Sequence, residues 1–167
     1  DPIEFLHRDK KSIVNQREID VDTRAVAPAL RAALRQDPDV ILVGEIRDHD
    51  TAEMAFRAAM TGHQVFSTLH TNSAIRSIPR LLDLGIKPDV LAGNVIGIVA
   101  QRLVRTLCPS CKAPHVPTAV ELSLLGDNDL GEVSLFKATG CTSCDFQGYK
   151  GRTSILELLK FDAALDE

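Results

Sequence analysis

Aromatic side chains are scarce in this chain of 167 residues, which has six Phe, one Tyr and no Trp. Its hydrophobic core must therefore be built mainly from Leu, Ile, Val and Ala. No apolar run approaches the roughly 20 residues that a membrane-spanning helix needs. The longest candidate, residues 90–100, is interrupted by Asn94 and two glycines, and we expect it to form a packed helix.

Positive charge is also sparse. The net charge is −4 at neutral pH, and no block of Lys or Arg alternates with aromatic residues. Such a chain is a poor match to a nucleic-acid-binding surface. Its contents of 44% apolar and 25% charged residues are ordinary for a globular protein, and its length allows one core with a small satellite.

The most informative segment is an apolar run that ends in an acid. Val40 to Val43 show no polar alternation, which predicts a strand buried on both faces of a parallel α/β sheet. Glu45 follows at the carboxyl end, where ligands bind in open α/β sheets. P-loop NTPases place an acid there, near nucleotide-bound magnesium. A solvated Glu after a buried strand is the simpler alternative.

A second strand is predicted over residues 64–69, and it leads directly into His70. The helix between the two strands is expected to begin with a capping box formed by Asp50 and Glu53, and to end at Gly62. A right-handed β-α-β crossover brings both strand ends to one edge of the sheet. We therefore expect the carboxylate and the imidazole that follow these strands to lie close together.

Other segments extend this pattern. Residues 1–4 read as the tail of a further strand, so that Glu4 would join Glu45 and His70 at one crevice. Two carboxylates and an imidazole at a sheet edge suit metal-assisted phosphoryl transfer. Helices are expected at about 24–36 and 74–84.

The four cysteines form two matched pairs, Cys108/Cys111 and Cys141/Cys144. Two-residue spacing lets adjacent thiolates reach one tetrahedral ion, so the pattern predicts a structural Cys₄ zinc site. A disulfide or a redox dithiol is the alternative interpretation. A closed set of four ligands leaves no position for substrate, so the zinc would stabilise the fold. We expect His115 to be solvated rather than a ligand.

Local signals predict some structure within and after the 29 residues that separate the cysteine pairs. Thr118 and Glu121 have capping-box spacing before a short helix. Residues 134–138 could form a strand. Residues 148–152 read as a turn, and residues 153–161 as a strand or a helix.

Four motifs resemble, in order, those of the motor ATPases of type II secretion and type IV pilus assembly. Residues 30–48 are similar to the Walker B region of that family, and residues 101–111 to the join between its motor core and zinc insert. Residues 1–4 look like the end of its Asp box. Residues 61–63 and 67–72 look like its His box. The resemblance covers nearly the whole chain.

This resemblance implies an α/β fold with three parts. Residues 1–106 would be part of a RecA-like P-loop NTPase core, a parallel sheet with flanking helices. Residues 107–150 would form the tetracysteine zinc-binding module, and residues 151–167 a terminal strand or helix segment. The family match favours a strand in the first half of that segment.

The resemblance also implies a function. Members of this family are hexameric ATPases that use ATP and Mg²⁺ to drive pilin or pseudopilin polymerisation. The implied partners are copies of the same chain, as a homo-hexamer, and inner-membrane platform proteins. The chain would lie at the cytoplasmic face of the inner membrane and associate with it peripherally, through those partners. The motifs do not choose between secretion and pilus assembly.

Residue roles follow from the same resemblance. Glu45 would act near magnesium, directly or through water, and Glu4 would help to polarise the attacking water. Either carboxylate could be the general base. His70 would contact the γ-phosphate region. The other predicted nucleotide-binding residues are Asp1, Arg47 and His63.

The two histidines of the His box are separated by a whole strand. At about 3.3 Å per residue, His63 would lie about 23 Å from His70, so one nucleotide cannot touch both from the same strand. A capping or packing role at the helix–strand joint therefore stays open for His63.

No G-x-x-x-x-G-K-[ST] loop occurs in the sequence. The chain thus lacks the backbone amides and the Lys that cradle phosphates. In the resembling family this loop precedes the Asp box. We therefore expect a carboxy-terminal fragment of a larger motor, without ATPase activity of its own.

Two other functions remain open from the sequence. The region could act mainly as a zinc-containing interaction and oligomerisation module. It could also be a zinc ribbon that binds nucleic acid, although the few basic residues near the cysteines are offset by acidic ones.

Overall fold

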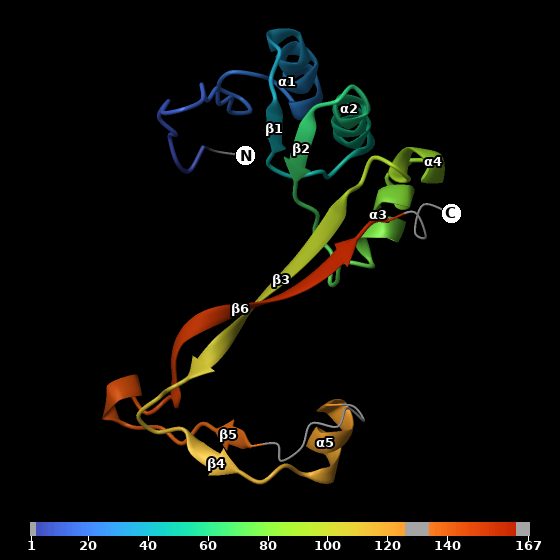
Figure 1. The fold of residues 1–167 in the computed structure, drawn as a ribbon. Coiled ribbons are helices and arrows are strands. Elements are labelled where there is room, and N and C mark those ends of the chain that lie inside the picture. The colour runs from blue at the N-terminus through green and yellow to red at the C-terminus, as the bar shows by residue number, and fades with distance from the viewer. Residues whose placement is uncertain (1–2, 126–133, 163–167) are drawn as a thin grey trace. The chain divides into compact units, whose positions relative to one another are not determined.

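The computed structural model describes residues 3–125 and 134–162 (Figure 1). The chain divides into two compact units. One comprises Asp1–Ala100 with Glu157–Glu167, and the other comprises Gln101–Leu156. The candidate catalytic residues belong to the first unit and the four cysteines to the second.

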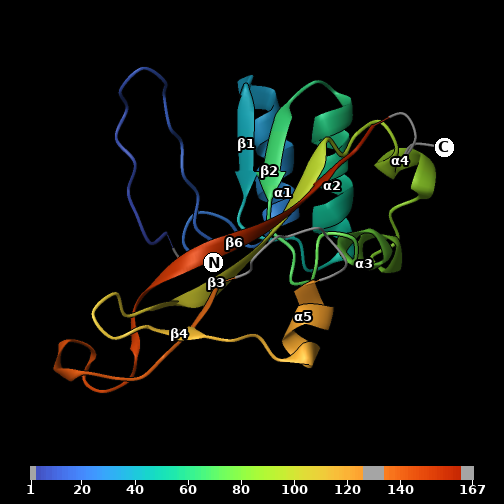
Figure 2. The ribbon, with the colours of Figure 1, turned by 60° about the horizontal axis from the view of Figure 1, so that its bottom comes forward.

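The first unit contains the predicted β-α-β crossover. Strands β1 (Val40–Val43) and β2 (Gln64–Ser67) pair in parallel, and helix α2 (His49–Met60) connects them (Figures 1 and 2). The chain enters β1 from helix α1 (Val26–Ala33) and the short 3₁₀-helix η1 (Leu34–Gln36). The helix expected at about 24–36 is therefore confirmed, with a tighter final turn.

Only one face of β1 is buried. Ile41 and Val43 are 8% and 3% exposed and pack with Leu30 of α1 and residues of α2, whereas Leu42 is 77% exposed. The prediction that both faces are buried is wrong for the described residues. The apolar run lacks the period-two pattern that normally marks a strand with one open face, so the sequence could not reveal which face is covered.

The start of α2 also differs from the prediction. Its N-cap is Asp48, whose carboxylate accepts hydrogen bonds from the amide and the hydroxyl of Thr51 at 2.8 and 3.1 Å. The expected capping box of Asp50 and Glu53 is therefore wrong. Asp50 lies in the first turn instead, where a negative charge is favourable to the helix dipole.

The segment predicted as a packed helix, residues 90–100, is not one. Helix α3 (Ser77–Asp83) lies within the expected range of 74–84, and the four-residue α4 (Pro88–Leu91) follows it. Gly93 then adopts a left-handed conformation with φ of 72°, which suits glycine and ends the helix. Strand β3 (Gly97–Leu107) begins four residues later.

Strands β3 and β6 (Tyr149–Lys160) form a two-stranded sheet. The amide of Phe161 donates to the carbonyl of Ile96 at 3.3 Å, and the amide of Cys108 donates to the carbonyl of Gly148 at 2.9 Å. The start of one strand thus faces the end of the other, so the pair is antiparallel. The predicted boundaries at 106/107 and 150/151 fall within these strands.

The sequence predicted a turn over 148–152, but β6 already begins at Tyr149. Gly151 has φ of 80° inside the strand, a conformation that suits glycine, and the strand continues past it. The strand alternative for residues 153–161 is confirmed.

The second unit holds small elements around the cysteines. Thr118 and Glu121 form the predicted capping box at the start of α5 (Ala119–Leu125), with Thr118 N–H donating to the Glu121 carboxylate at 2.7 Å. The predicted strand near 134–138 is β5 (Leu135–Lys137). Strand β4 (Ala113–His115) pairs with it antiparallel. In the part of the chain that the structure describes, no helix has the length and apolarity to cross a bilayer.

Candidate functional site

Glu45 and His70 follow β1 and β2, and the structure brings them together. His70 Nε2 lies 2.9 Å from Glu45 Oε2, which is hydrogen-bonding distance. Because β1 and β2 are parallel neighbours, both residues lie at the same edge of the sheet. The described partners of Glu45 are His70 and Arg47.

The residues next to this pair anchor it to the core. Ile46, directly after Glu45, is 8% exposed and belongs to a buried cluster between α2 and α3. Leu69, directly before His70, packs against the same cluster. Ile46 is thus buried and Leu69 partly buried in the core, and each is the direct neighbour of one member of the pair. These two anchors hold the segments that carry Glu45 and His70.

Glu45 is ionised at neutral pH. The Arg47 guanidinium is the main cause that lowers the pKa of this carboxyl, burial opposes the effect, and the His70 ring lowers it further. The Glu45 side chain is 11% exposed, whereas those of Arg47 and His70 are 69% and 83% exposed. The arrangement is a shielded carboxylate with two accessible donor groups beside it.

This arrangement suits a hydrated cation and a phosphate. Carboxylate oxygens are the ligands that Mg²⁺ prefers, usually with several waters kept on the ion. The same carboxylate can accept a proton from water. The exposed imidazole and guanidinium can donate hydrogen bonds to phosphate oxygens. The chemistry of these groups therefore fits the predicted metal and nucleotide.

Glu4 and Asp1, the two other predicted acids, do not extend this cluster within the described residues. Glu4 lies outside any helix or strand, so the strand tail expected over residues 1–4 is absent at residues 3 and 4. Asp1 lies outside the described residues.

His63 lies at the other end of β2. Its Nδ1 is 3.1 Å from the carbonyl oxygen of Ala58 and 3.1 Å from Thr61 Oγ1. Ala58 is in the last turn of α2, so this ring caps the carboxyl end of the helix. His63 therefore lies away from Glu45 and His70. It occupies the helix-capping position that was the alternative to nucleotide binding.

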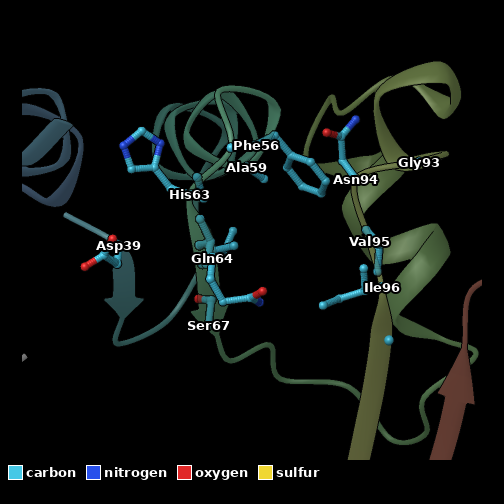
Figure 3. A pocket seen from close by; sticks show the side chains of 15 residues that line it. Asp39, Phe56, Ala59, His63, Gln64, Ser67, Gly93, Asn94, Val95 and Ile96 are labelled. Carbon is cyan, nitrogen blue, oxygen red and sulfur yellow. The ribbon is translucent and has the colours of Figure 1, made fainter. Parts of the chain in front are cut away.

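A cavity of about 400 Å³ lies beside β2, between α2 and residues 93–97 (Figure 3). Phe56, Val65, Val95 and His63 are among its lining residues. Glu45 and His70 are not among its lining residues. This cavity is thus separate from the candidate catalytic pair.

The four cysteines of the second unit form a candidate metal centre. Their Sγ atoms all lie within 4.8 Å of one another. The Cys108–Cys141, Cys111–Cys144 and Cys141–Cys144 separations are 4.0, 3.8 and 3.8 Å. Four sulfurs about 2.3 Å from a tetrahedral zinc ion are about 3.8 Å apart. The donor set therefore fits zinc.

Hydrogen bonds to the sulfur of Cys144 favour its thiolate. The amides of Cys141 and Gly148 donate to Cys144 Sγ at 3.3 and 3.2 Å. Burial alone would raise the pKa of the Cys144 thiol, but these two amides and the neighbouring thiols lower it to about 7. Burial is the main cause that raises the pKa of Cys141 to about 11. A bound cation would remove this obstacle, because it stabilises the thiolate.

His115 is not part of the sulfur cluster. The prediction that His115 is solvated is wrong. Its Nε2 lies 3.0 Å from the Glu121 carboxylate, and its side chain is only 27% exposed. This histidine instead joins the end of β4 to the capping box of α5.

No role was predicted from the sequence for one residue near the candidate catalytic pair. Thr68 donates a side-chain hydrogen bond to the Gly44 carbonyl at 2.8 Å, and its own carbonyl accepts from the Ile46 amide at 3.0 Å. Its signals in the sequence were its place in residues 67–72, which resemble the His box, and its position at the end of a strand that leads to a candidate site.

Comparison with known proteins identifies related chains. The family described as "Type II/IV secretion system protein" matches residues 1–167. The Type II secretion system protein E of Pseudomonas aeruginosa is 52% identical over 163 residues, which are 97% of this chain and 32% of that protein. The Type II secretion system ATPase E of Vibrio cholerae is 49% identical over all of this chain and 33% of its own length.

Pilus proteins are also similar. The Type IV pilus assembly ATPase TfpB of Acinetobacter baylyi is 43% identical over all of this chain and 28% of its own length. The crystal structure of the pilus retraction motor PilT with bound ADP matches with a TM-score of 0.68 and 40% identity, over 99% of this chain and 38% of that one. The chain thus spans about a third of the length of these relatives.

Proposed function

Since the chain belongs to the family of type II/IV secretion system proteins, we propose that it forms part of an ATPase that couples ATP hydrolysis to type II secretion or type IV pilus assembly. The family resemblance predicted from the sequence is confirmed by this membership. Relatives named as ATPases occur in both systems, so the proposal covers both.

The observation that carries this proposal is the contact between Glu45 and His70 at the carboxyl ends of two parallel strands. Ligands bind at that edge in open α/β sheets. Glu45 would hold Mg²⁺, directly or through water, or accept a proton from the attacking water, and Glu4 would assist as the second acid. His70 and Arg47 would donate to phosphate oxygens. The roles of Asp1 and His63 in nucleotide binding remain predictions from the family.

Bound magnesium would supply charge neutralisation on the phosphates. The protein groups have separate tasks. Glu45 provides an ionised carboxylate because Arg47 and His70 stabilise its negative charge. The phosphate-cradling loop is absent from this sequence, so the phosphates would need amides from outside these residues. The related PilT structure contains bound ADP, which supports a nucleotide as the ligand of this fold.

We also propose that the four cysteines hold one structural Zn²⁺. The sulfur separations match tetrahedral coordination, and all four positions would be filled by protein ligands. The zinc would therefore stabilise the second unit and take no part in hydrolysis.

The larger assembly follows from the family. We propose a RecA-like core that works in a homo-hexamer at the cytoplasmic face of the inner membrane, where platform proteins would recruit it. Its work would be the polymerisation of pilins or pseudopilins.

The decisive experiment uses a full-length type II secretion ATPase in which this chain replaces the matching segment. We expect Glu45→Gln to lower kcat for ATP hydrolysis by about 100-fold or more, because loss of a general base costs about 10²–10⁴ in rate. ATP binding should persist. Glu53→Gln on the exposed side of α2 is the matched control, and it should leave kcat within about twofold. Wild-type kcat in the Glu45→Gln chimera would overturn the proposal.

A further inference from the structure

Thr68 contacts the chain on both sides of Glu45. Its hydroxyl donates to the Gly44 carbonyl at 2.8 Å, and its carbonyl accepts from the Ile46 amide at 3.0 Å. The parallel pairing of β1 with β2 ends at Val43 and Ser67. Thr68 therefore continues the contact between the two segments beyond the regular ladder, at the point where the candidate site begins.

These two bonds restrain the direction of the Glu45 side chain. The Gly44 carbonyl belongs to the peptide plane before the Cα of Glu45, and the Ile46 amide belongs to the plane after it. Peptide units are planar, so a bond to each plane restricts φ and ψ at Glu45 and with them the Cα–Cβ direction. Any residue at position 68, proline included, could accept from the Ile46 amide through its backbone carbonyl. The bond to the Gly44 carbonyl instead needs the side-chain hydroxyl of Thr68.

Thr68 is also linked to the other member of the pair. Leu69 follows it and packs against the buried cluster that contains Ile46, and His70 comes next. The segment 68–70 thus carries, in three consecutive residues, a bond to the backbone around Glu45, an anchor in the core and the imidazole itself. A shift of Thr68 would change the separation between Glu45 and His70.

We propose that Thr68 is a positioning residue, which holds the Glu45 carboxylate within hydrogen-bonding distance of His70. Thr68 acts through these two side chains. Its consequence for catalysis rests on the function proposed above, whereas its effect on the geometry of the pair does not.

The geometric part can be tested on the 167-residue chain by NMR. The readout is the nuclear Overhauser contact between the His70 ring protons and the γ-protons of Glu45. Thr68→Val keeps the β-branched shape but removes the hydroxyl, and we expect this contact to be lost. Thr68→Ser keeps a hydroxyl and should retain the contact. Ser67→Ala removes a hydroxyl one position earlier and should also retain it.

An unchanged contact between Glu45 and His70 in Thr68→Val would overturn the proposal. The Thr68 side chain is exposed, so we expect the variant to fold. Amide shifts of Ile41 and Val43 report on the fold independently. If they show unfolding, Thr68→Ala removes the hydroxyl without adding an apolar methyl group. Loss of the contact between Glu45 and His70 in that variant would support the proposal, and an unchanged contact would overturn it.

The catalytic part is tested in the full-length chimera. We expect Thr68→Val to lower kcat about tenfold with KM for ATP nearly unchanged, and Thr68→Ser to restore kcat. If Glu45→Gln abolishes turnover but Thr68→Val leaves kcat at the wild-type value, the positioning role is wrong and the proposed function stands. If Glu45→Gln has no effect, the proposed function is wrong, and the NMR comparison still decides the role of Thr68.

Discussion

The Glu121 carboxylate accepts hydrogen bonds from the Thr118 amide and hydroxyl at 2.7 and 2.8 Å. It also lies 3.0 Å from His115 Nε2. These partners, with the Thr118 amide the strongest, lower the pKa of Glu121 from 4.5 to about 2. A depressed pKa means that the ionised carboxylate is stabilised in the folded state.

The capping box should therefore respond to acid in a defined window. A lowered folded pKa contributes stability above the unfolded pKa, and this stability is lost as the pH falls from about 4.5 to about 2. We expect the Thr118 amide resonance to titrate with a midpoint near 2. In Thr118→Val, which lacks the hydroxyl bond, the midpoint should rise. A midpoint near 4.5 in the wild type would contradict this assignment.

The two histidines of the His box show that the role of a histidine depends on the groups that surround it. His63 contacts a helix-terminal carbonyl, and His70 contacts a shielded carboxylate. The sequence suggested this difference because the two residues lie at opposite ends of one strand. It could not show that Thr68 bridges to the backbone around Glu45, since that bond joins residues 24 positions apart.

At the level of elements, β1 shows that helix packing determines which face of a strand is buried. The β-α-β order was predictable because apolar runs, a helical period and a glycine stop all agreed. Which face of β1 is covered depends on where α1 and α2 pack. The sequence of the strand has no alternation of polar and apolar residues that would indicate the covered face.

This asymmetry predicts different costs for neighbouring substitutions in the 167-residue chain. We expect Ile41→Ala to lower the free energy of unfolding by about 2–4 kcal/mol, because it opens a cavity in the core. Leu42→Ala is the matched control. Its side chain is 77% exposed, so the loss should stay below about 1 kcal/mol. Urea unfolding measures both, and equal losses would show that the two faces are equally buried.

The cysteine module makes a second prediction at this scale. Structural zinc contributes folding free energy directly, with apparent values of about 10–16 kcal/mol in small zinc domains. We expect one zinc per chain, and chelation should abolish the hydrogen-exchange protection of β4 and β5 while β1 and β2 keep theirs.

Cys111→Ser should have the effect of the chelator, whereas Ser110→Ala, at the neighbouring position, should retain one zinc. A zinc content well below one per chain after purification without chelator would count against the site. So would a chelated chain whose β4 and β5 amides stay protected.

The segment 90–100 shows the opposite limit of sequence reasoning. Its apolar residues fit a helix as well as a strand by composition. Gly93 in a left-handed conformation ends α4, and the pairing of β3 with β6 then supplies the hydrogen bonds that make the following residues a strand. The partner strand lies about 50 residues away in the sequence, so no local pattern could predict this strand pairing.

At the scale of the whole molecule, this sequence would supply only part of the proposed hydrolytic site. The ionised Glu45 and its two donors are present, but no residue of the sequence forms the loop that cradles phosphates. We therefore expect the purified 167-residue chain to release phosphate from ATP at the background rate. The full-length chimera described above should hydrolyse ATP under the same conditions.

Comparing the purified chain with the full-length chimera tests whether hydrolysis needs a phosphate-binding loop from outside this sequence. Phosphate release that rises in proportion to the concentration of the purified chain, and that disappears in the Glu45→Gln variant, would contradict it. Release that persists in this variant would indicate a contaminating ATPase.

By itself, the sequence determined the family, the β-α-β order, the tetracysteine spacing and the capping box of α5, because each depends on residues close together in the chain or on a motif with a set order. The tertiary structure alone decided the covered face of β1, the pairing of β3 with β6 and the bond from Thr68 to Gly44. Those features depend on contacts between distant residues, whose formation is set by packing rather than by any local pattern.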